Sequence, residues 1–184
     1  MSTLIHIDVP QASRVAVGFE TPIAMLKECH RKVHDQCQTL QRLVPHLVTH
    51  GSDQAAAQAT AAIVRYFDMA GPQHHADEEE DVLPALLESV AGSDAVCLRE
   101  IADTLHADHE ALNQQWAALR RVLSEVMQGQ AVRLDETLVH DFVAHYRAHI
   151  DFEEAQVLPM AERLLSVAAM AKIGLSMRRR RGER

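Results

Sequence analysis

The sequence predicts an all-α protein, an up-down-up-down four-helix bundle with a short N-terminal arm and an extra C-terminal helix. Apolar residues recur at three- and four-residue spacing through four long segments. The 7 glycines and 6 prolines among 184 residues fall mostly between these segments. The chain shows no alternating strand pattern. Long amphipathic helices joined by short loops favour a bundle.

The helices can be placed in order along the chain. Thr21 offers a hydroxyl N-cap, and Pro22 follows at the first helical position. Gly71-Pro72 predicts a kink in the second helix. The expected helices cover about residues 22–50, 54–90, 95–127, 134–165 and 166–177. We therefore expect an arm over residues 1–21, a bundle domain over 22–177, and a basic tail over 178–184 that forms a solvated end.

Composition narrows the class of protein. The net charge of −8 disfavours nucleic acid as a partner. No apolar stretch approaches the roughly 18 residues of a membrane span, and the first residues lack the pattern of a signal peptide. Cys29, Cys37 and Cys97 form neither a disulfide framework nor a CxxC pair. We expect a cytoplasmic protein, and its 12 histidines need an explanation.

The histidines occupy matched positions of a weak internal repeat. His30 and His109 are each followed by apolar residues or cysteine three, seven and ten positions later. Each therefore lies on the apolar face of its helix. A single such histidine is usually an ordinary core residue. His30 and His109 therefore indicate a metal site only in combination with the second half of the repeat.

Two HxxxE pairs form that second half. His74 and Glu78 lie in one pair, and His149 and Glu153 lie in the other; each ends in Val-Leu-Pro, with proline ten residues after the histidine. Residues four apart share one helix face. Imidazoles and carboxylates suit transition metals, and two glutamates offset the charge of two neighbouring cations. The combination predicts a two-metal site in the bundle core.

Several neighbouring residues could add a ligand or an outer hydrogen bond. His75 with Glu79 is a second HxxxE pair, but the offset to proline favours His74 with Glu78. The further candidates are His34, His75, Glu79, His106, His145 and Glu154.

The order His, HxxxE, His, HxxxE over residues 22–165 resembles the hemerythrin-like, or HHE cation-binding, domains. The resemblance implies a non-haem di-iron centre, with zinc or manganese as substitutes. Carried over residue by residue, the implied ligands are His30, His74, Glu78, His109, His149 and Glu153, with the two glutamates bridging.

The chain departs from the oxygen carriers of that family. Their third helix carries two histidine ligands four apart, whereas His106 and His109 are three apart. Their last acidic ligand is an aspartate five residues after histidine, whereas Glu153 stands at four and Glu154 at five. The resemblance also extends to bacterial proteins that repair damaged iron centres, but residues 1–21 hold no cysteine like that of their N-terminal module.

The resemblance implies binding of O2, or of a related diatomic such as NO, more than a dedicated enzymatic activity. The alternatives are an iron-responsive sensory or interaction module, and a di-iron oxidase, peroxidase or iron-centre repair factor. Among partners we expect the small gas ligand, no nucleic acid and no membrane, and we leave a homodimer open.

Overall fold

The computed structural model describes residues 17–130 and 133–183, and within these ranges it contains helices and no β-strand. The elements are α1 (Pro22–His50), α2 (Gln54–Asp77), the π-helical turn η1 (Glu78–Val82), α3 (Leu83–Ser89), α4 (Ser93–Met127), α5 (Glu136–Phe152), the π-helical turn η2 (Glu153–Val157), α6 (Leu158–Leu164) and α7 (Val167–Arg180). The predicted all-α class is confirmed. Most of the expected N-terminal arm, residues 1–16, lies outside the described residues.

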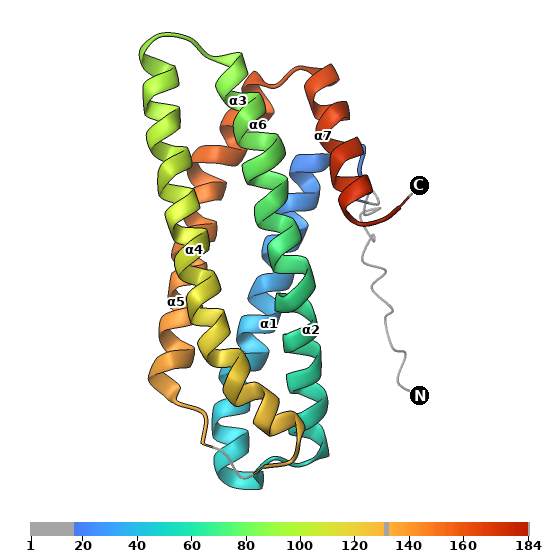
Figure 1. The fold of residues 1–184 in the computed structure, drawn as a ribbon, viewed down its shortest axis with the longest axis vertical. Helices are drawn as coiled ribbons and strands as arrows, with labels where there is room; N and C mark the ends of the chain where they lie inside the picture. Colours follow the sequence, from blue (N-terminus) through green and yellow to red (C-terminus); the bar gives the residue numbers. More distant parts are fainter. Residues whose placement is uncertain (1–16, 131–132, 184) are drawn as a thin grey trace, which may run out of the picture.

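The long helices lie side by side (Figure 1) and can be grouped into rods. The rods are α1, α2 continued by η1 and α3, α4, and α5 continued by η2 and α6. Neighbouring rods contact in the order α1, α2, α4, α5 and back to α1, and α3 also contacts α6 across the bundle. The short helix α7 packs against α1, α2 and η1, beside the start of α1 (Figure 1).

Local signals explain most helix ends. The Asp53 carboxylate accepts a hydrogen bond from the Ala56 amide at 2.8 Å and caps α2. Pro22 stands in the first turn of α1, as expected. The expected cap by the Thr21 hydroxyl is wrong, because this hydroxyl donates to the Gly18 carbonyl at 3.1 Å instead.

The second helix is interrupted later than the sequence suggested. α2 continues through Gly71 and Pro72 to Asp77, and the irregular turn is η1. Proline lacks an N–H and its ring clashes with the carbonyl four residues earlier. Pro84 therefore cannot close a normal α-turn with Glu80.

The bundle core consists of two apolar clusters. One includes Val33, Leu40, Phe67, Leu119 and Phe142, and the other includes Ile23, Leu26, Leu86, Leu105 and Leu158. Along α1 and α4 the second cluster comes first in sequence, whereas along the rods that begin with α2 and α5 the first cluster does. Both clusters consist of side chains withdrawn from water, and such burial is the main driving force of folding.

None of the helices in the described ranges combines the length and the apolar character needed to cross a bilayer.

Candidate metal centre

A layer of buried polar side chains separates the two apolar clusters. Each of these residues falls, along its helix, between residues of one cluster and residues of the other. The layer consists of His30, His74, His75, Glu78, His109, His149 and Glu153, all at most 5% exposed. Histidine and glutamate are seldom buried this deeply without a partner.

The two glutamates occupy equivalent backbone positions. Glu78 is the first residue of η1, and Glu153 is the first residue of η2. The amide of Leu83 donates to the Glu78 carbonyl, and the amide of Leu158 to the Glu153 carbonyl, which are the five-residue hydrogen bonds of a π-turn. A proline follows each of these leucines, so the repeated Val-Leu-Pro explains why both helices widen here.

The first group of converging atoms involves α1 and α2. The Nε2 atoms of His30 and His74 lie 3.1 Å apart. Glu153 Oε2 lies 3.0 Å from His30 Nε2, and Glu78 Oε1 lies 3.3 Å from His74 Nε2. One ligand atom from each of these four residues fits within a set no wider than 4.8 Å.

The second group involves α4 and α5. The Nε2 atoms of His109 and His149 lie 3.2 Å apart. Glu153 Oε1 lies 2.9 Å from His149 Nε2, and Glu78 Oε2 lies 3.5 Å from His109 Nε2. Ligand atoms of these four residues also lie within 4.8 Å of one another. Atoms that share one ion at about 2.1 Å are roughly 3.0–3.4 Å apart, which is the spacing of both histidine pairs.

Each carboxylate therefore spans the two groups. Glu78 turns Oε1 toward His74 and Oε2 toward His109. Glu153 turns Oε2 toward His30 and Oε1 toward His149. This is the arrangement that a pair of cations with two shared carboxylates requires.

His75 also points into the layer. Its ring stacks on that of His109, with centroids 3.9 Å apart and an interplanar angle of 8°. Neither ring nitrogen has a hydrogen-bond partner among the described residues. One of its nitrogens lies within 4.8 Å of ligand atoms of His109 and His149. His75 is thus placed to add a nitrogen to the second group.

An outer pair of glutamates holds two of the imidazoles. Glu154 Oε1 lies 3.0 Å from His30 Nδ1, and Glu79 Oε1 lies 2.6 Å from His109 Nδ1. Each is the residue directly after a spanning glutamate. A carboxylate that accepts a hydrogen bond from Nδ1–H orients the ring and fixes the tautomer whose Nε2 can bind a metal when the ring is neutral.

The remaining sequence candidates lie farther out. His106 is 62% exposed and reaches Glu79 Oε1 at 3.2 Å. His145 Nδ1 lies 3.1 Å from Gln115 Oε1. His34 is half-buried and belongs to none of the His/Glu groups in the described residues. None of the three stands among the converging ligand atoms.

Burial and proximity shift the pKa values of the layer. Burial and repulsion from Glu153 raise the pKa of Glu78 to about 8. Burial also acts to raise the pKa of Glu153, but contacts with three imidazoles hold it well below its ordinary value. Burial lowers the pKa of His74 to about 3, while the two glutamates outweigh burial and raise the pKa of His109 to about 10.

The layer fits a metal better than it fits an apolar core. All four oxygens of Glu78 and Glu153 are buried without a well-formed hydrogen bond from any described residue. An ionised carboxylate in such a place costs several kcal/mol unless it is paired. Bound cations would pair these carboxylates, and the seven residues of the layer offer nitrogen and oxygen donors that iron, zinc and manganese all accept.

The comparison with known families decides the relationship. The model of the hemerythrin HHE cation-binding domain matches residues 21–161, which include every residue of the layer. This chain belongs to the hemerythrin HHE cation-binding family. The predicted resemblance is confirmed, and metal binding at the His/Glu groups is the property that the family implies.

One relative shows that the likeness extends over nearly the whole chain. A protein of Haemophilus influenzae, described as uncharacterized, is 36% identical over 160 residues. The alignment covers 87% of this chain and 90% of the relative. It supports the fold of this HHE domain and adds no activity.

The structure adds a contact that sequence reasoning missed. The arginines near the C-terminus were expected to form a solvated end, but Arg180 and Arg181 bind Asp77, which is 0% exposed and precedes Glu78. The helix extends to Arg180 because its arginines pair with acidic groups of α2 and η1. Only the opposite charges of the two segments hinted at this pairing.

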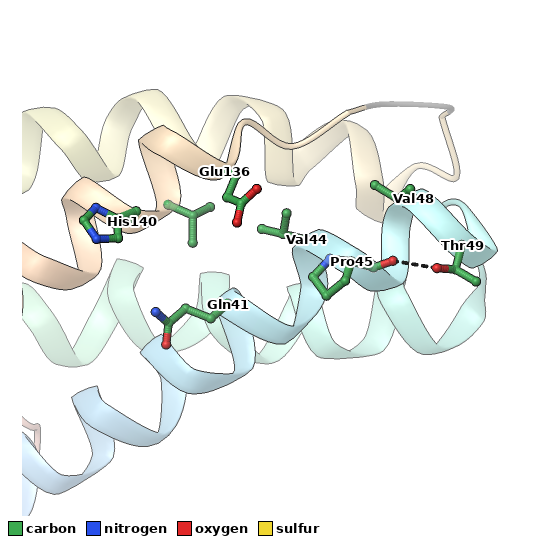
Figure 2. A pocket seen from close by; sticks show the side chains of 8 residues that line it. Gln41, Val44, Pro45, Val48, Thr49, Glu136 and His140 are labelled. Atoms are coloured by element: carbon green, nitrogen blue, oxygen red, sulfur yellow. Dashed lines mark hydrogen bonds between the residues drawn. The ribbon is translucent and has the colours of Figure 1, made fainter.

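A surface groove lies apart from the HHE layer. It runs between the C-terminal half of α1 and the start of α5, where Gln41, Val44 and His140 line it (Figure 2). Val44 is 14 residues beyond His30, about 20 Å along the helix. The metal-binding groups are therefore internal and separate from this groove.

Proposed function

We propose that this protein is a non-haem di-iron protein that binds O2 or a related diatomic such as NO. The proposal rests on the placement of the two carboxylates. Glu78 and Glu153 each have one oxygen near the pair His30 and His74 and the other oxygen near the pair His109 and His149. The family supplies the expectation of a metal, and the donor set supports two ions with zinc or manganese as substitutes.

The proposed ligands follow from the two groups. His30 and His74 would hold one ion, and His109, His149 and His75 the other, with the two glutamates shared. When bound, the iron pair would supply an open coordination position and electrons for a diatomic ligand. Glu79 and Glu154 would keep the Nδ1 protons of His109 and His30 in place.

We also infer the arrangement that carries these ligands. The two apolar clusters are met in opposite order along consecutive rods, which supports the up-down-up-down topology over the predicted domain of residues 22–177. Cys29, Cys37 and Cys97 are free thiols, which supports a reducing compartment such as the cytoplasm.

The experiment is a gas titration of anaerobic, iron-loaded protein followed by absorption spectroscopy. We expect new visible bands with O2 or NO. Bands that reverse when the gas is removed support reversible binding, whereas irreversible oxidation with turnover of peroxide supports an enzyme. The absence of any spectral change with either gas contradicts the proposal.

A second candidate is an iron-responsive sensory module. The buried oxygens of Glu78 and Glu153, which lack a well-formed hydrogen bond from the described residues, favour it, because ion binding then adds directly to the free energy of unfolding. A large melting shift on iron loading, with no response to either gas, would distinguish this function.

A further inference from the structure

The C-terminal helix α7 and the next residue, Arg181, bind acidic residues around Glu78. These residues belong to the first half of the repeat, His74 to Pro84, which we call the first half-site; the second half-site runs from His149 to Pro159. Arg181 Nη2 lies 2.6 Å from Asp77 Oδ2, and Arg181 Nη1 lies 3.1 Å from Asp77 Oδ1. Arg180 Nη1 also bonds Asp77 Oδ1 and reaches Asp81 Oδ2 at 2.9 Å. Arg180 Nη2 lies 2.8 Å from Glu80 Oε2. Two guanidinium groups thus tie three carboxylates together.

These contacts involve residues close before and after Glu78 in the chain. Asp77 ends α2, and Glu78 begins η1, so the bound residue and the proposed ligand are adjacent in the chain. Asp81 lies inside the same π-turn. A buried carboxylate that loses its charged partner is strongly destabilising, so Asp77 favours the docked position of α7.

Other contacts hold α7 in place independently of the two arginines. Ile173 and Met177 are buried in the second apolar cluster. A Cβ atom on Gly174 would lie 1.9 Å from the Phe19 carbonyl oxygen, so only glycine allows this close approach. The arginines therefore extend from a helix whose position the fold already defines.

The second half-site lacks this support in the described residues. The position equivalent to Asp77 is Phe152, a half-buried residue that packs against the second apolar cluster. No described arginine forms an ion pair with Glu153 or Glu154. Among the described residues, arginine ion pairs from another helix thus support the turn that presents Glu78 and not the turn that presents Glu153.

We propose that α7 is a clamp that orients the first half of the metal centre, with Arg180 and Arg181 as positioning residues for Glu78. The two guanidinium groups bind Asp77 and Asp81, which lie before and after Glu78 in the chain, and so hold the π-turn that presents Glu78. Arginine suits this role because its planar fork binds carboxylates with two hydrogen bonds at once. The inference rests on the proposed two-metal function.

The test is the variant Arg180→Ala/Arg181→Ala, compared with Arg178→Ala. Arg178 lies on the same helix but pairs with Glu20 at 2.8 Å, away from η1. We expect the double variant to lose about 10- to 100-fold in affinity for iron or zinc, the range found when groups that orient metal ligands are removed. We expect Arg178→Ala to keep the wild-type affinity.

A second readout works without metal. Hydrogen exchange of the metal-free chain should become at least tenfold faster over η1 (Glu78–Val82) in the double variant and stay unchanged over η2 (Glu153–Val157). If the double variant does not fold, Arg181→Gln takes its place with the same expected directions. Unchanged affinity, unchanged exchange over η1, or an equal effect of Arg178→Ala would overturn the clamp. Absence of metal from the wild-type protein would instead overturn the proposed function, and the exchange comparison would still test the clamp.

Discussion

Glu78 and Glu153 each begin a π-helical turn that ends in Leu-Pro, yet the residues around them differ. In the half-site on α2, His75 and the buried Asp77 precede Glu78. In the half-site on α5, Ile150 and Phe152 stand at the matching positions and pack in the apolar clusters. The repeated Val-Leu-Pro pattern therefore accounts for the position of both glutamates. Only the half-site on α2 adds a further histidine, His75, and a buried aspartate, Asp77, that pairs with arginines.

The largest expected effect is the loss of a spanning carboxylate. Glu153→Ala removes the group that faces His30 on one side and His149 on the other, so both ions lose a ligand. We expect metal content to fall from two ions per chain to at most one, measured by elemental analysis of purified protein. His74→Ala should likewise prevent two-metal binding.

A matched control for this change is His140→Ala, on an exposed histidine of α5 far from the layer. It should leave the metal content as in the wild type. Unchanged metal content in both Glu153→Ala and His74→Ala would contradict the assignment of the site.

Metal removal should show how much the buried charges depend on the ions. The metal-free protein retains the two glutamates in the core, where a buried carboxylate without an adequate partner costs several kcal/mol. We expect a chelator to lower the melting temperature by more than 5 °C, because about 1 kcal/mol corresponds to roughly 2–4 °C for a domain of this size. Calorimetry with and without chelator measures the shift.

Glu78→Gln sharpens this prediction. Burial and repulsion from Glu153 raise the pKa of Glu78 to about 8, so the ionised form of Glu78 is less stable in the metal-free core than that of Glu153. The amide should raise the melting temperature of the metal-free protein by roughly 2–4 °C, about 1 kcal/mol, while it weakens metal binding. A lower melting temperature of the metal-free variant would show that the layer is already well paired without ions.

The next effect concerns the residue that makes the first half different. His75→Ala removes a nitrogen from the second ion while both shared carboxylates remain. We expect affinity for one of the two ions to fall by about 10- to 100-fold and affinity for the other to stay near the wild-type value. Calorimetric titration with zinc resolves the two sites. Equal weakening of both sites would mean that His75 only packs against His109.

The smallest effect compares the outer glutamates. Glu79 contacts His109 Nδ1 at 2.6 Å and is 30% exposed, whereas Glu154 contacts His30 Nδ1 at 3.0 Å and is 47% exposed. The more buried contact is the stronger one. Glu79→Gln should therefore weaken metal binding by about tenfold and Glu154→Gln by less. The reverse order, in the same titration, would contradict this reading of the two contacts.

Much of the fold and of the core layer could be predicted from the sequence. The helical spacing of apolar residues gave the rods, and the repeat placed His30 and His109 on inward faces, where the structure also has them buried. The offset to proline selected His74 over His75, but both point inward. Adjacent residues on a helix lie about 100° apart, and α2 packs against both α1 and α4, so His74 can face His30 while His75 faces His109.

The rest depended on contacts that no local pattern contains. Asp77 and Arg181 are 104 residues apart, and their pairing requires α7 to fold back along the bundle. Pro84 and Pro159 indicate that the helix is irregular nearby, but the sequence alone does not show that the irregular turn is a π-turn that begins at the glutamate. Sequence reasoning could place the charges but could not pair them.

The measurement that tests the central claim most directly is metal analysis of anaerobically purified protein, joined to its absorption spectrum before and after exposure to air. The account predicts two ions per chain, with iron bound when iron is supplied, and a spectrum that changes with air. One ion or none per chain in the wild-type protein, with iron and zinc both supplied, would contradict a shared site built on Glu78 and Glu153.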